Sequence, residues 1–513
     1  MCGGQQAGEA MRVLFVTSEV QPLAKTGGLA DVSGALPIAL ARRGIDVRLM
    51  LPAYPSALAQ LKNPKVEATL PPIAGVDGGA LISGTLPDTG IPVWLVDAPA
   101  LFLRNGGLYQ DETGRDWPDN AQRFAFLSHV AVHVAQGKIR GWDADIVHAN
   151  DWHAGLVPLL LGMQGRPRPA SVFTIHNLAY QGNFPREVLG QIGIPEYYFA
   201  TDGVEFYGRV SFLKAAIRYA DRVTTVSPTY ACETLTPEFG CGLDGLLRRR
   251  RGDYSGILNG IDDALWNPAT DPHLARNFCP QDLSGKRLCK AALQKEMGLQ
   301  AAPAAPLVGF VSRFAHQKMA DVVLEAIAGL VEAGAQFVAL GEGDAALEAA
   351  FAEAANRFPG RVAARIGYSE PLAHRLQAGA DILLAPARFE PCGLTQLYAA
   401  RYGTLSVVRR TGGLADTIAD AAAGAPEGRL AAGFTFVEPS LCAFQETLGR
   451  ALALFGKPLA WRRLQLQAMA QDFSWNASAA DYIALYRALC GRPRLVAAAP
   501  ASERDDDQAR QAS

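Results

Sequence analysis

Short apolar runs alternate with helical patterns along most of the chain, and this alternation limits the fold more than any other feature. In the first half, runs rich in β-branched and aromatic residues are separated by stretches in which apolar residues recur at helical spacing. The expected strands are 13–17, 45–51, 92–96, 146–148, 171–175 and 222–226. This alternation predicts an α/β fold with a doubly wound parallel sheet, in which the loops after the carboxyl ends of the strands carry the function.

The alternation breaks over residues 241–306, where glycine, proline and basic residues accumulate, and then resumes. The second set of expected strands is 307–311, 337–340, 362–366, 382–384 and 405–408. A chain of 513 residues is too long for one core, so we expect two doubly wound domains facing each other across a cleft. The expected parts are a disordered extension 1–10, an N-terminal domain 11–258, a C-terminal domain 259–479, a helix 480–492 that packs back on the N-terminal domain, and a disordered tail 493–513.

Charge and cysteine content exclude several classes of function. The formal net charge of −2 leaves no basic footprint for nucleic acid, and the run 248–251 of four arginines is more typical of a solvated loop than of a binding patch. No apolar stretch is long enough to span a bilayer. The eight cysteines form no C-x-x-C pair, which argues against a disulfide framework or a zinc site and fits a reducing cytoplasm.

The loop after the first strand, K-T-G-G-L-A-D at residues 25–31, combines a lysine with two adjacent glycines and opens a helix. Glycines allow close approach of a ligand, and unpaired helix-start amides favour an anion, so one hypothesis is a phosphate or diphosphate site. A tight β-to-α turn is an equally good interpretation of the loop alone, since it matches neither G-x-G-x-x-G nor a Walker loop. The sequence T-G-G-L-A-D recurs at 411–416, which we interpret as reuse of one loop chemistry rather than as duplication.

Two loops of the second domain carry charged residues after expected strands. Arg313 and Lys318 are five positions apart across a strand-to-helix loop and suit a diphosphate, although this pair alone favours two solvated cations. Glu390 precedes a proline turn and a helix start near Leu394. That helix start suits a phosphate or a sugar hydroxyl, and the carboxylate suits a cationic sugar. The alternative is a helix-initiating turn with Glu390 serving the helix dipole.

Histidines follow two strands of the first domain. His148 and His153 have poor spacing for a metal pair, and no third ligand is apparent, so we expect no metal. His176 and Asn177 have the same setting, but a single histidine is most often a structural residue.

Seven motifs in order resemble those of bacterial glycogen synthases and plant starch synthases. They lie at 25–31, 148–155, 173–182, 258–262, 388–396, 409–416 and 472–475, and the resemblance runs from residue 11 to about 489. It implies a GT-B fold with two Rossmann-like domains and the active site between them. It also implies retaining transfer of glucose from ADP-glucose to the non-reducing end of an α-1,4-glucan (glycogen) primer, without a cofactor or a metal.

The resemblance also implies roles for individual residues. The implied catalytic residues are Glu390, Arg313, Lys318, His176 and Asp151. The implied substrate-binding residues are Lys25, Gly27, Gly28, Asp31, Asn177, Asn259, Tyr368, Cys392, Gly393, Leu394 and Thr395. Lys25 and the two glycines would lie at the diphosphate, and Arg313 and Lys318 would stabilise the leaving ADP. Tyr368 would stack on adenine, while Leu394 and Thr395 would hold phosphate. Glu390 would bind glucose hydroxyls. Asp151, His176, Asn177 and Asn259 would line the sugar and acceptor side.

The sequence departs from the family pattern at two places. Met319-Ala320 stands after Lys318, where the family has Gly-Leu, and Ala387 stands where it has Ser. A lost glycine would shift Lys318 if that position requires a positive φ.

Three alternatives to an ADP-glucose-dependent synthase remain. One is a GT-B transferase that uses another nucleotide sugar, and a second is a phosphorylase, for which no pyridoxal-phosphate lysine is evident. The third is a non-catalytic glucan-binding or regulatory protein, which would not need Lys25, Arg313, Lys318 and Glu390 together. The sequence leaves open the donor base, the regulation, and whether the chain forms a homo-oligomer. No nucleophile pair is evident, so we favour front-face attack over a covalent intermediate.

Overall fold

A computed structural model describes residues 10–138, 142–165, 167–421 and 430–490, and these form two compact units. The first unit comprises the described residues up to 225, residues 234–255 and those from 479 onward. The second comprises 226–233 and 256–478. Of the expected terminal segments, 1–10 lies outside the described residues except for Ala10, and 493–513 lies outside them entirely.

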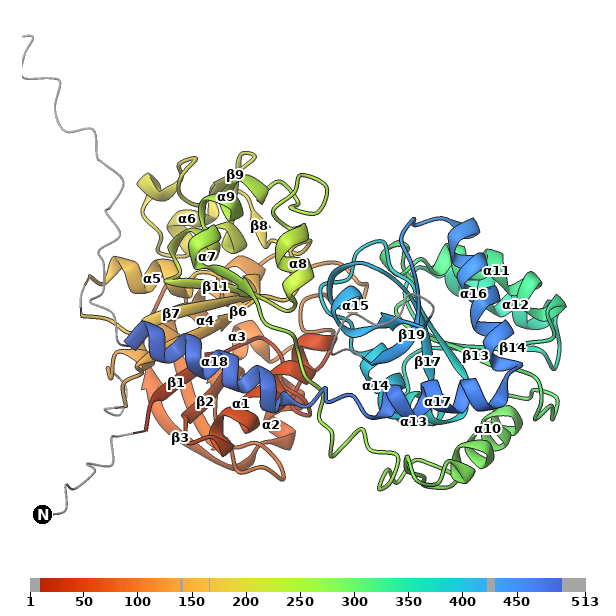
Figure 1. Cartoon of the computed structure of the whole chain (residues 1–513). Helices are drawn as coiled ribbons and strands as arrows, with labels where there is room; N and C mark the ends of the chain where they lie inside the picture. Colours follow the sequence, from red (N-terminus) through yellow and green to blue (C-terminus); the bar gives the residue numbers. More distant parts are fainter. Residues whose placement is uncertain (1–9, 139–141, 166, 422–429, 491–513) are drawn as a thin grey trace, which may run out of the picture. The chain divides into compact units, whose positions relative to one another are not determined.

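The described part of the first unit is built on a nine-stranded sheet in the order β12-β11-β7-β6-β1-β2-β5-β4-β3 (Figure 1). The parallel strands are β1 (Arg12–Val16), β2 (Asp46–Pro52), β5 (Pro92–Asp97), β6 (Ile146–Asn150), β7 (Ala170–Ile175) and β11 (Arg222–Thr225), and β12 is Tyr254–Gly256. Their order is that of a doubly wound nucleotide-binding sheet, with β1 and β6 as the central pair where the winding reverses. The prediction of a parallel doubly wound sheet is confirmed.

An antiparallel pair at one edge of this sheet was not predicted. β3 (Lys62–Leu70) pairs with β4 (Gly79–Thr85), which in turn pairs antiparallel with β5. β3 is exposed over most of its length, so it lacks the apolar run of a buried strand. A smaller sheet, β8-β10-β9, is formed by Asn183–Phe184, Arg209–Ser211 and Glu205–Phe206.

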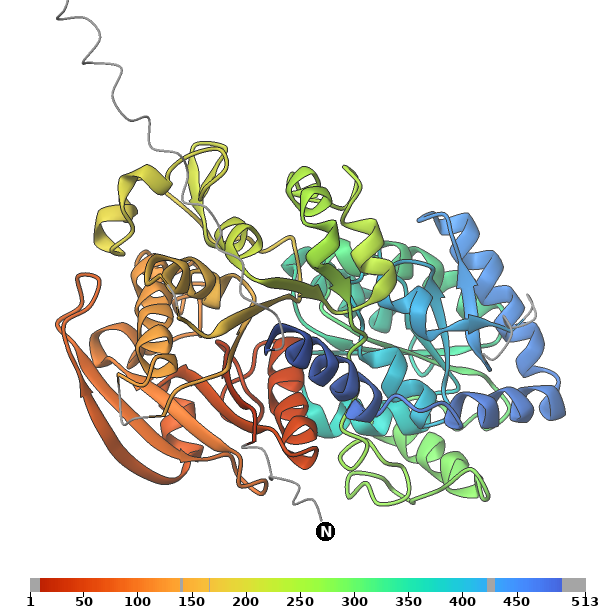
Figure 2. The ribbon, with the colours of Figure 1, turned by 60° about the vertical axis from the view of Figure 1, so that its left-hand side comes forward.

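Helices cover the first sheet because its central strands are apolar on both faces. All four residues 13–16 of β1 are fully buried. The main helices are α1 (Gly28–Arg42), α4 (Asn120–Ala135), α5 (Val157–Met163), α7 (Phe212–Tyr219), α9 (Asp244–Arg249) and α18 (Trp475–Cys490). Figure 1 shows α18 lying across the sheet, and Figure 2 shows it beside α1. Tyr486 of α18 contacts His148 of β6.

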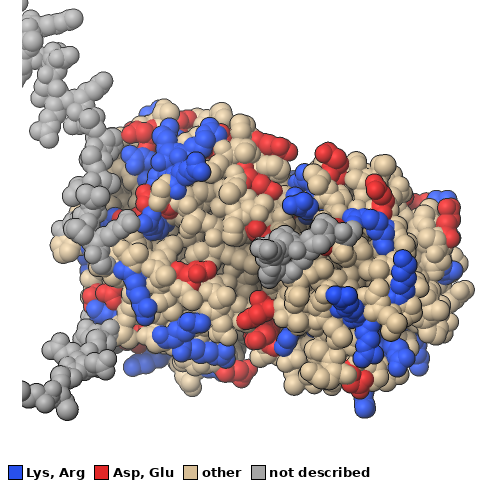
Figure 3. Space-filling view, viewed as in Figure 1, with Lys and Arg blue, Asp and Glu red and all other residues tan. Residues whose placement is uncertain are grey.

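The arginine run at 248–251 is exposed, as expected, except at Arg250. Basic side chains do gather on the surface of the first unit around α6 (Val188–Gln191) and α9 (Figure 3), and Arg249 and Arg251 are exposed. Arg250, however, donates from its guanidinium to the carbonyls of residues 217, 218 and 220 at the end of α7. It therefore stabilises a helix C-terminus rather than being solvated.

The second unit contains a parallel sheet of seven described strands in the order β15-β14-β13-β16-β17-β19-β18. These are β13 (Leu307–Val311), β14 (Gln336–Gly341), β15 (Val362–Ile366), β16 (Ile382–Ala385), β17 (Leu405–Arg409), β18 (Ala419–Asp420) and β19 (Ala431–Phe436). The winding reverses between β13 and β16. Its main helices are α8 (Pro228–Glu233), α10 (Ser284–Glu296), α11 (Ala320–Glu332), α12 (Ala345–Arg357), α13 (Glu370–Gly379), α14 (Thr395–Arg401), α15 (Gly412–Thr417), α16 (Leu441–Phe455) and α17 (Pro458–Met469).

Alternate residues of β13 enter two different hydrophobic clusters. Val308 and Phe310 pack with α11 and α16, whereas Leu307 and Val311 pack with α10 and α13. Because successive side chains of a strand point to opposite faces, helices cover both faces of this sheet. No helix in the described ranges has the length and apolar character needed to cross a membrane.

Residues 226–233 group with the second unit although they follow β11 of the first. In α8, the amide and hydroxyl of Thr229 donate to Asp416 at 2.9 and 2.7 Å. Ser227 donates from Oγ to the carbonyl of Pro391 at 2.7 Å. These bonds fix α8 beside α15 and the 386–394 loop.

Candidate active site

The loops at the reversal point of the second sheet carry three of the charged residues singled out from the sequence. Residues 312–318 follow β13 and residues 386–394 follow β16. Ligands of doubly wound sheets bind beyond the carboxyl ends of the strands at this point. Arg313, Lys318 and Glu390 all lie in these two loops.

Lys318 and Glu390 form an ion pair between the two loops, with Nζ donating to Oε2. Glu390 is only 8% exposed, so the carboxylate needs a partner to offset the cost of burial. Arg313 lies on the exposed side of the same loop and donates from Nη2 to Gln317 Oε1 at 3.3 Å. The site thus combines a paired cation with a second, more accessible one.

Gln317 and Arg388 hold these loops together, and the sequence reasoning did not assign them a role. Gln317 donates from Nε2 to the carbonyl of Phe389 at 3.1 Å, and its own carbonyl accepts the amide of Arg388 at 2.8 Å. Arg388 forms a two-pronged ion pair with Asp321 of α11 at 2.9 and 2.7 Å. A guanidinium held in this fork has little freedom, so the positions of Lys318 and Glu390 are well defined.

Met319, which replaces the family's usual glycine, adopts the left-handed conformation with φ of +51°. The position therefore does require the backbone conformation that glycine adopts without cost. Met319 is fully buried and its side chain joins the cluster of α11 and α16. That burial offsets the strain and lets Lys318 stay in place without the glycine.

The residues that follow Glu390 form a tight turn before α14. Gly393 has φ of +74°, and a Cβ there would lie 2.5 Å from Gln396 Oε1. The Cys392 thiol is buried, and burial raises its pKa to about 12, so it remains protonated. Asn259 is also buried, and no described residue donates to its Oδ1. An unpaired buried acceptor of this kind is suited to a ligand hydroxyl.

Tyr368 lies after β15 and is 54% exposed. Gly367, with φ of +101°, turns the chain there, and Ser369 then caps α13 because its Oγ accepts the amide of Leu372 at 3.4 Å. The tyrosine ring is thus presented on the surface of the second unit.

In the first unit, the loop before α1 already holds a carboxylate from the protein itself. Glu19 accepts the amides of Thr26 and Gly27 at 2.6 and 3.1 Å and the Thr26 hydroxyl at 2.6 Å. Tyr109 donates its hydroxyl to the same carboxylate at 2.5 Å. Glu19 is buried, and neither it nor Tyr109 was singled out from the sequence. The Gly27 amide, which the diphosphate hypothesis assigned to a ligand, is therefore bonded to Glu19, as is the neighbouring Thr26 amide.

Gly27 and Lys25 nevertheless remain accessible. Gly27 is exposed, its backbone is extended with φ of −160°, and a Cβ there would meet no atom within 4 Å. Neither packing nor strain in the described structure demands glycine at this position, which favours a role in ligand approach over a tight turn. Lys25 pairs with Asp31 of α1 at 2.8 Å, and both side chains are about a quarter exposed.

In the second T-G-G-L-A-D copy, at 411–416, a glutamate again accepts hydrogen bonds from the threonine and the first glycine, but here that glycine is closely packed. Glu233 accepts the Thr411 hydroxyl at 2.9 Å and the Gly412 amide at 3.0 Å, as Glu19 does in the first copy. A Cβ on Gly412 would lie 1.7 Å from the carbonyl oxygen of Glu390. Here the glycine is required by close packing against the Glu390 loop.

Asp151, His176 and Asn177 come together after β6 and β7 of the first unit. Asp151 Oδ1 accepts the amide of His176 at 2.7 Å and that of Asn177 at 3.5 Å, and its φ of +54° is unusual for a residue other than glycine. Burial raises the pKa of Asp151 to about 7, against the two amides that lower it. Burial lowers the pKa of His176 to about 3, so its imidazole is neutral at physiological pH. Its Nε2 lies 3.0 Å from Asn150 Oδ1, which is an acceptor, so Nδ1 carries the lone pair.

The other two histidines of this region have structural surroundings. His148 is fully buried between Tyr486 and Thr174, at 2.7 and 2.6 Å. His153 is buried against the ring of Tyr109, with 4.3 Å between ring centroids. The described residues contain no cluster of three or more His, Cys, Asp or Glu side chains arranged to hold a metal ion.

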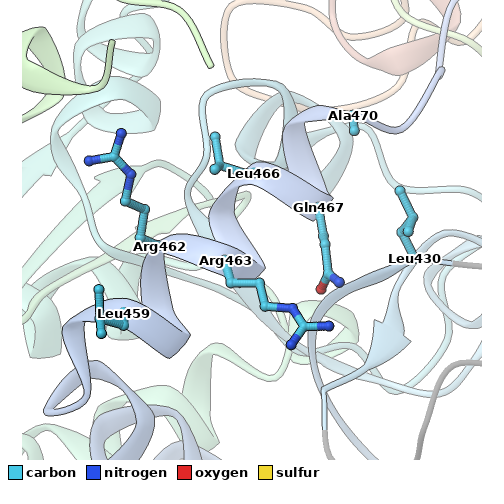
Figure 4. Close-up of a pocket in the computed structure, with 7 residues that line it drawn as sticks. All are labelled: Leu430, Leu459, Arg462, Arg463, Leu466, Gln467 and Ala470. Carbon is cyan, nitrogen blue, oxygen red and sulfur yellow. The ribbon is translucent and has the colours of Figure 1, made fainter. Parts of the chain in front are cut away.

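Two surface hollows are lined by other residues. One of about 490 Å³ is lined by α17 and Leu430 (Figure 4). The other, of about 500 Å³, is lined by β3, the residues after it, and the end of α4. None of the residues expected to bind substrate lines either hollow.

Comparison with known proteins identifies the family. Residues 12–249 match the model of the starch synthase catalytic domain, and residues 305–440 match that of glycosyl transferases group 1. A glycogen synthase of Paramagnetospirillum magneticum is 53% identical over 484 residues, covering 94% of this chain and 98% of the relative. The chain belongs to the glycogen synthase and starch synthase family.

Other members and neighbours support the same conclusion. A glycogen synthase of Burkholderia thailandensis is 52% identical, with 94% of this chain and 92% of the relative covered. The catalytic domain of starch synthase IV from Arabidopsis thaliana, solved with ADP and acarbose, superposes with a TM-score of 0.86 at 34% identity over 94% of this chain and all of that one. Its likeness and the two doubly wound units show a GT-B fold, and the predicted family and fold are confirmed. A sucrose-phosphate synthase from Thermosynechococcus elongatus, with a TM-score of 0.57 and 18% identity, shares the fold alone.

Proposed function

We propose that this member of the family is an ADP-glucose-dependent α-1,4-glucan synthase that acts in glycogen biosynthesis. It would transfer glucose from ADP-glucose, with retention, to the non-reducing end of a glycogen primer and release ADP. The observation that carries the proposal is the Lys318–Glu390 pair at the reversal point of the second sheet, next to Arg313. Relatives named glycogen synthase cover nearly the whole chain and support it.

The charges of the second unit match those that develop in this reaction. The leaving ADP gains negative charge as the glycosidic C–O bond breaks, and the anomeric carbon gains positive charge. We assign Lys318 and Arg313 to the diphosphate, and Glu390 to the glucose hydroxyls and the cationic ring. Since Lys318 bonds to Glu390 in this structure, donor binding would move its ammonium from the carboxylate to the phosphate.

Other residues of the second unit would hold the donor in place. Tyr368 presents an exposed ring that suits stacking on adenine. Gly393 and the N-cap residue Leu394 precede α14, which begins at Thr395, and these three residues would donate backbone amides to phosphate. Asn259 and Cys392 would border the sugar, where the unpaired Oδ1 of Asn259 would accept a hydroxyl.

The first unit would supply the residues that line the acceptor side, and its Lys25 would contact the donor diphosphate. Neutral His176 offers Nδ1 as a hydrogen-bond acceptor, and Asp151 orients both His176 and Asn177. Lys25, paired with Asp31, and the exposed Gly27 and Gly28 would meet the diphosphate. We propose that retention occurs by front-face attack, with the departing phosphate taking the acceptor proton. A trapped glucosyl-enzyme adduct would contradict that step.

The reaction is expected in the cytoplasm. All seven described cysteines are free thiols, which suits a reducing compartment. Whether the enzyme acts as a homo-oligomer would be settled by its mass in solution.

The decisive experiment supplies the purified enzyme with radiolabelled ADP-glucose or UDP-glucose and a glycogen primer. Incorporation from ADP-glucose well above that from UDP-glucose is the expected result. The reverse preference would indicate a transferase with another donor, and no incorporation from either would indicate a glucan-binding protein. Lys318→Gln should abolish most incorporation, whereas the exposed Lys295→Gln on α10 is the matched control and should not.

A further inference from the structure

An exposed tyrosine occupies an unfavourable backbone conformation at the tip of a hairpin in the first unit. β9 (Glu205–Phe206) and β10 (Arg209–Ser211) are antiparallel and joined by the two residues Tyr207 and Gly208. Both have positive φ, +48° and +76°, a turn in which Asn-Gly is the favoured sequence. A bulky residue at the first position is an outlier that persists where surroundings hold it and function uses it.

The surroundings fix both the turn and the tyrosine ring. Glu205 accepts the Gly208 amide at 2.7 Å, which locks the turn. The Phe206 ring meets the Tyr207 ring edge to face, with centroids 4.7 Å apart. Gly242, with φ of +79°, lies near the edge of the tyrosine ring, where a Cβ would come within 3.3 Å of the ring carbon Cε2 and 3.4 Å of the hydroxyl oxygen. The ring thus has Phe206 and Gly242 as neighbours, yet Tyr207 is 81% exposed.

The hairpin is joined by hydrogen bonds to the segment that follows the acceptor-side residues. Gln181, a few positions after Asn177, donates from Nε2 to the carbonyl of Cys241 at 3.0 Å, beside Gly242. Gln181 also accepts Asn183 Nδ2 at 3.0 Å, and the carbonyl of Asn183 accepts Arg209 at 2.8 Å. These bonds join the base of the hairpin to the chain segment that begins with the proposed acceptor-side residues His176 and Asn177.

We propose that Tyr207, with Phe206 and Gly242 behind it, is a binding platform for the α-glucan chain, outside the residues that perform transfer. A glucose unit presents a C–H face that packs on an aromatic ring, while its hydroxyls reach polar groups such as those of Glu205 and Arg209 beside the turn. A ring that already packs against Phe206 has less freedom to lose on binding than one without such a contact. A polymeric substrate can be held there while its end is elongated elsewhere, which raises the effective concentration of chain ends.

This inference rests on the proposed function, since a glucan is the ligand, but its test does not require turnover. The measurement is the dissociation constant for glycogen from affinity electrophoresis in native gels, without a sugar nucleotide. Tyr207→Asn places the residue that the turn prefers and should weaken binding by about three- to tenfold, the range that corresponds to one aromatic contact. Tyr207→Phe should bind within about twofold of wild type because it keeps the ring.

Tyr197→Asn is the matched control, because Tyr197 is another tyrosine of the first unit and is 62% exposed. It should bind glycogen as wild type does. Tyr207→Asn should melt at or above the wild-type temperature, since asparagine tolerates the positive φ, so lost binding would not reflect unfolding. In synthesis assays, Tyr207→Asn should raise the KM for glycogen and leave the KM for ADP-glucose unchanged.

Wild-type affinity in Tyr207→Asn, or equal loss in Tyr197→Asn, would overturn the platform. If the wild-type protein transfers no glucose but binds glycogen, and Tyr207→Asn weakens that binding, the proposed synthase activity is refuted and the platform is supported.

Discussion

The carboxylate of Glu19 accepts the backbone amide of Gly27 at 3.1 Å, so an anion of the protein itself is bonded to the loop proposed to meet the diphosphate. Glu233 does the same for Gly412 in the second copy of the motif. Glu19→Gln should lower the free energy of unfolding by about 1–3 kcal/mol, because hydrogen bonds to a buried charge are lost. Glu233→Gln is the matched variant and should show a comparable loss in urea titrations. Unchanged unfolding midpoints in both variants would mean that these glutamates do not hold the loops.

Lys25→Ala tests the first loop directly. We expect an impaired turnover and a raised KM for ADP-glucose, with little change in melting temperature, because the Lys25–Asp31 pair is partly exposed and contributes little to stability. Steady-state kinetics and a melting curve measure the two effects. Normal kinetics in the variant would make the loop a simple turn.

Breaking the Lys318–Glu390 pair should have separate effects on rate and stability. Lys318→Gln should reduce kcat by roughly two to three orders of magnitude, the usual cost of removing a preorganised charge-stabilising group. It should also destabilise the fold, because Glu390 is left buried without its cation. Adding Glu390→Gln should restore stability but not activity. If the double variant recovered both stability and activity, the Lys318–Glu390 pair would have only a structural role.

Two substitutions at Met319 distinguish the contribution of backbone strain to stability from that of side-chain burial. Met319→Ala should cost about 2–5 kcal/mol of unfolding free energy, since a fully buried side chain is lost. Met319→Gly loses the same side chain but relieves the positive φ, so it should be more stable than the alanine variant by about 1 kcal/mol. Denaturant titration of both variants measures the difference, and an alanine variant as stable as the glycine variant would argue against strain at this position.

Asp151 should make stability depend on pH. Its pKa in the folded state, about 7, lies above the ordinary value of 3.8. Between these values the folded protein holds a proton that the unfolded chain releases, so the free energy of unfolding falls as pH rises from about 4 to 7 and levels off above that. In Asp151→Asn this part of the pH dependence should disappear, whereas the exposed Asp263→Asn should keep it. Superimposable pH profiles for wild type and Asp151→Asn would refute the shift.

Much of the fold was predictable because it depends on local patterns. Strands such as β1 and β13 are apolar runs bounded by polar loops, and their positions agree with prediction within about a residue or two. The β3–β4 pair was missed because β3, with Lys62 and Lys65, is an exposed edge strand without an apolar signal.

The site was less predictable where it depends on contacts distant in sequence. Tyr109 lies 90 positions from Glu19, and Glu233 lies 179 positions from Gly412. Nothing local to Glu19 distinguishes it from a loop carboxylate. The need for a positive φ at Met319 was inferred only as a condition, and the structure shows that it applies.

The interleaving of the two units along the chain affects how such a protein can be divided. Residues 226–233 and 479 onward each belong to a different unit from the residues before them. A chain truncated at 478 would keep all of the second unit but deprive the first of Tyr486, leaving a ring nitrogen of His148 without its hydroxyl partner. Neither unit corresponds to a single continuous stretch of gene, so recombination that exchanges one unit for that of a relative needs several crossover points rather than one.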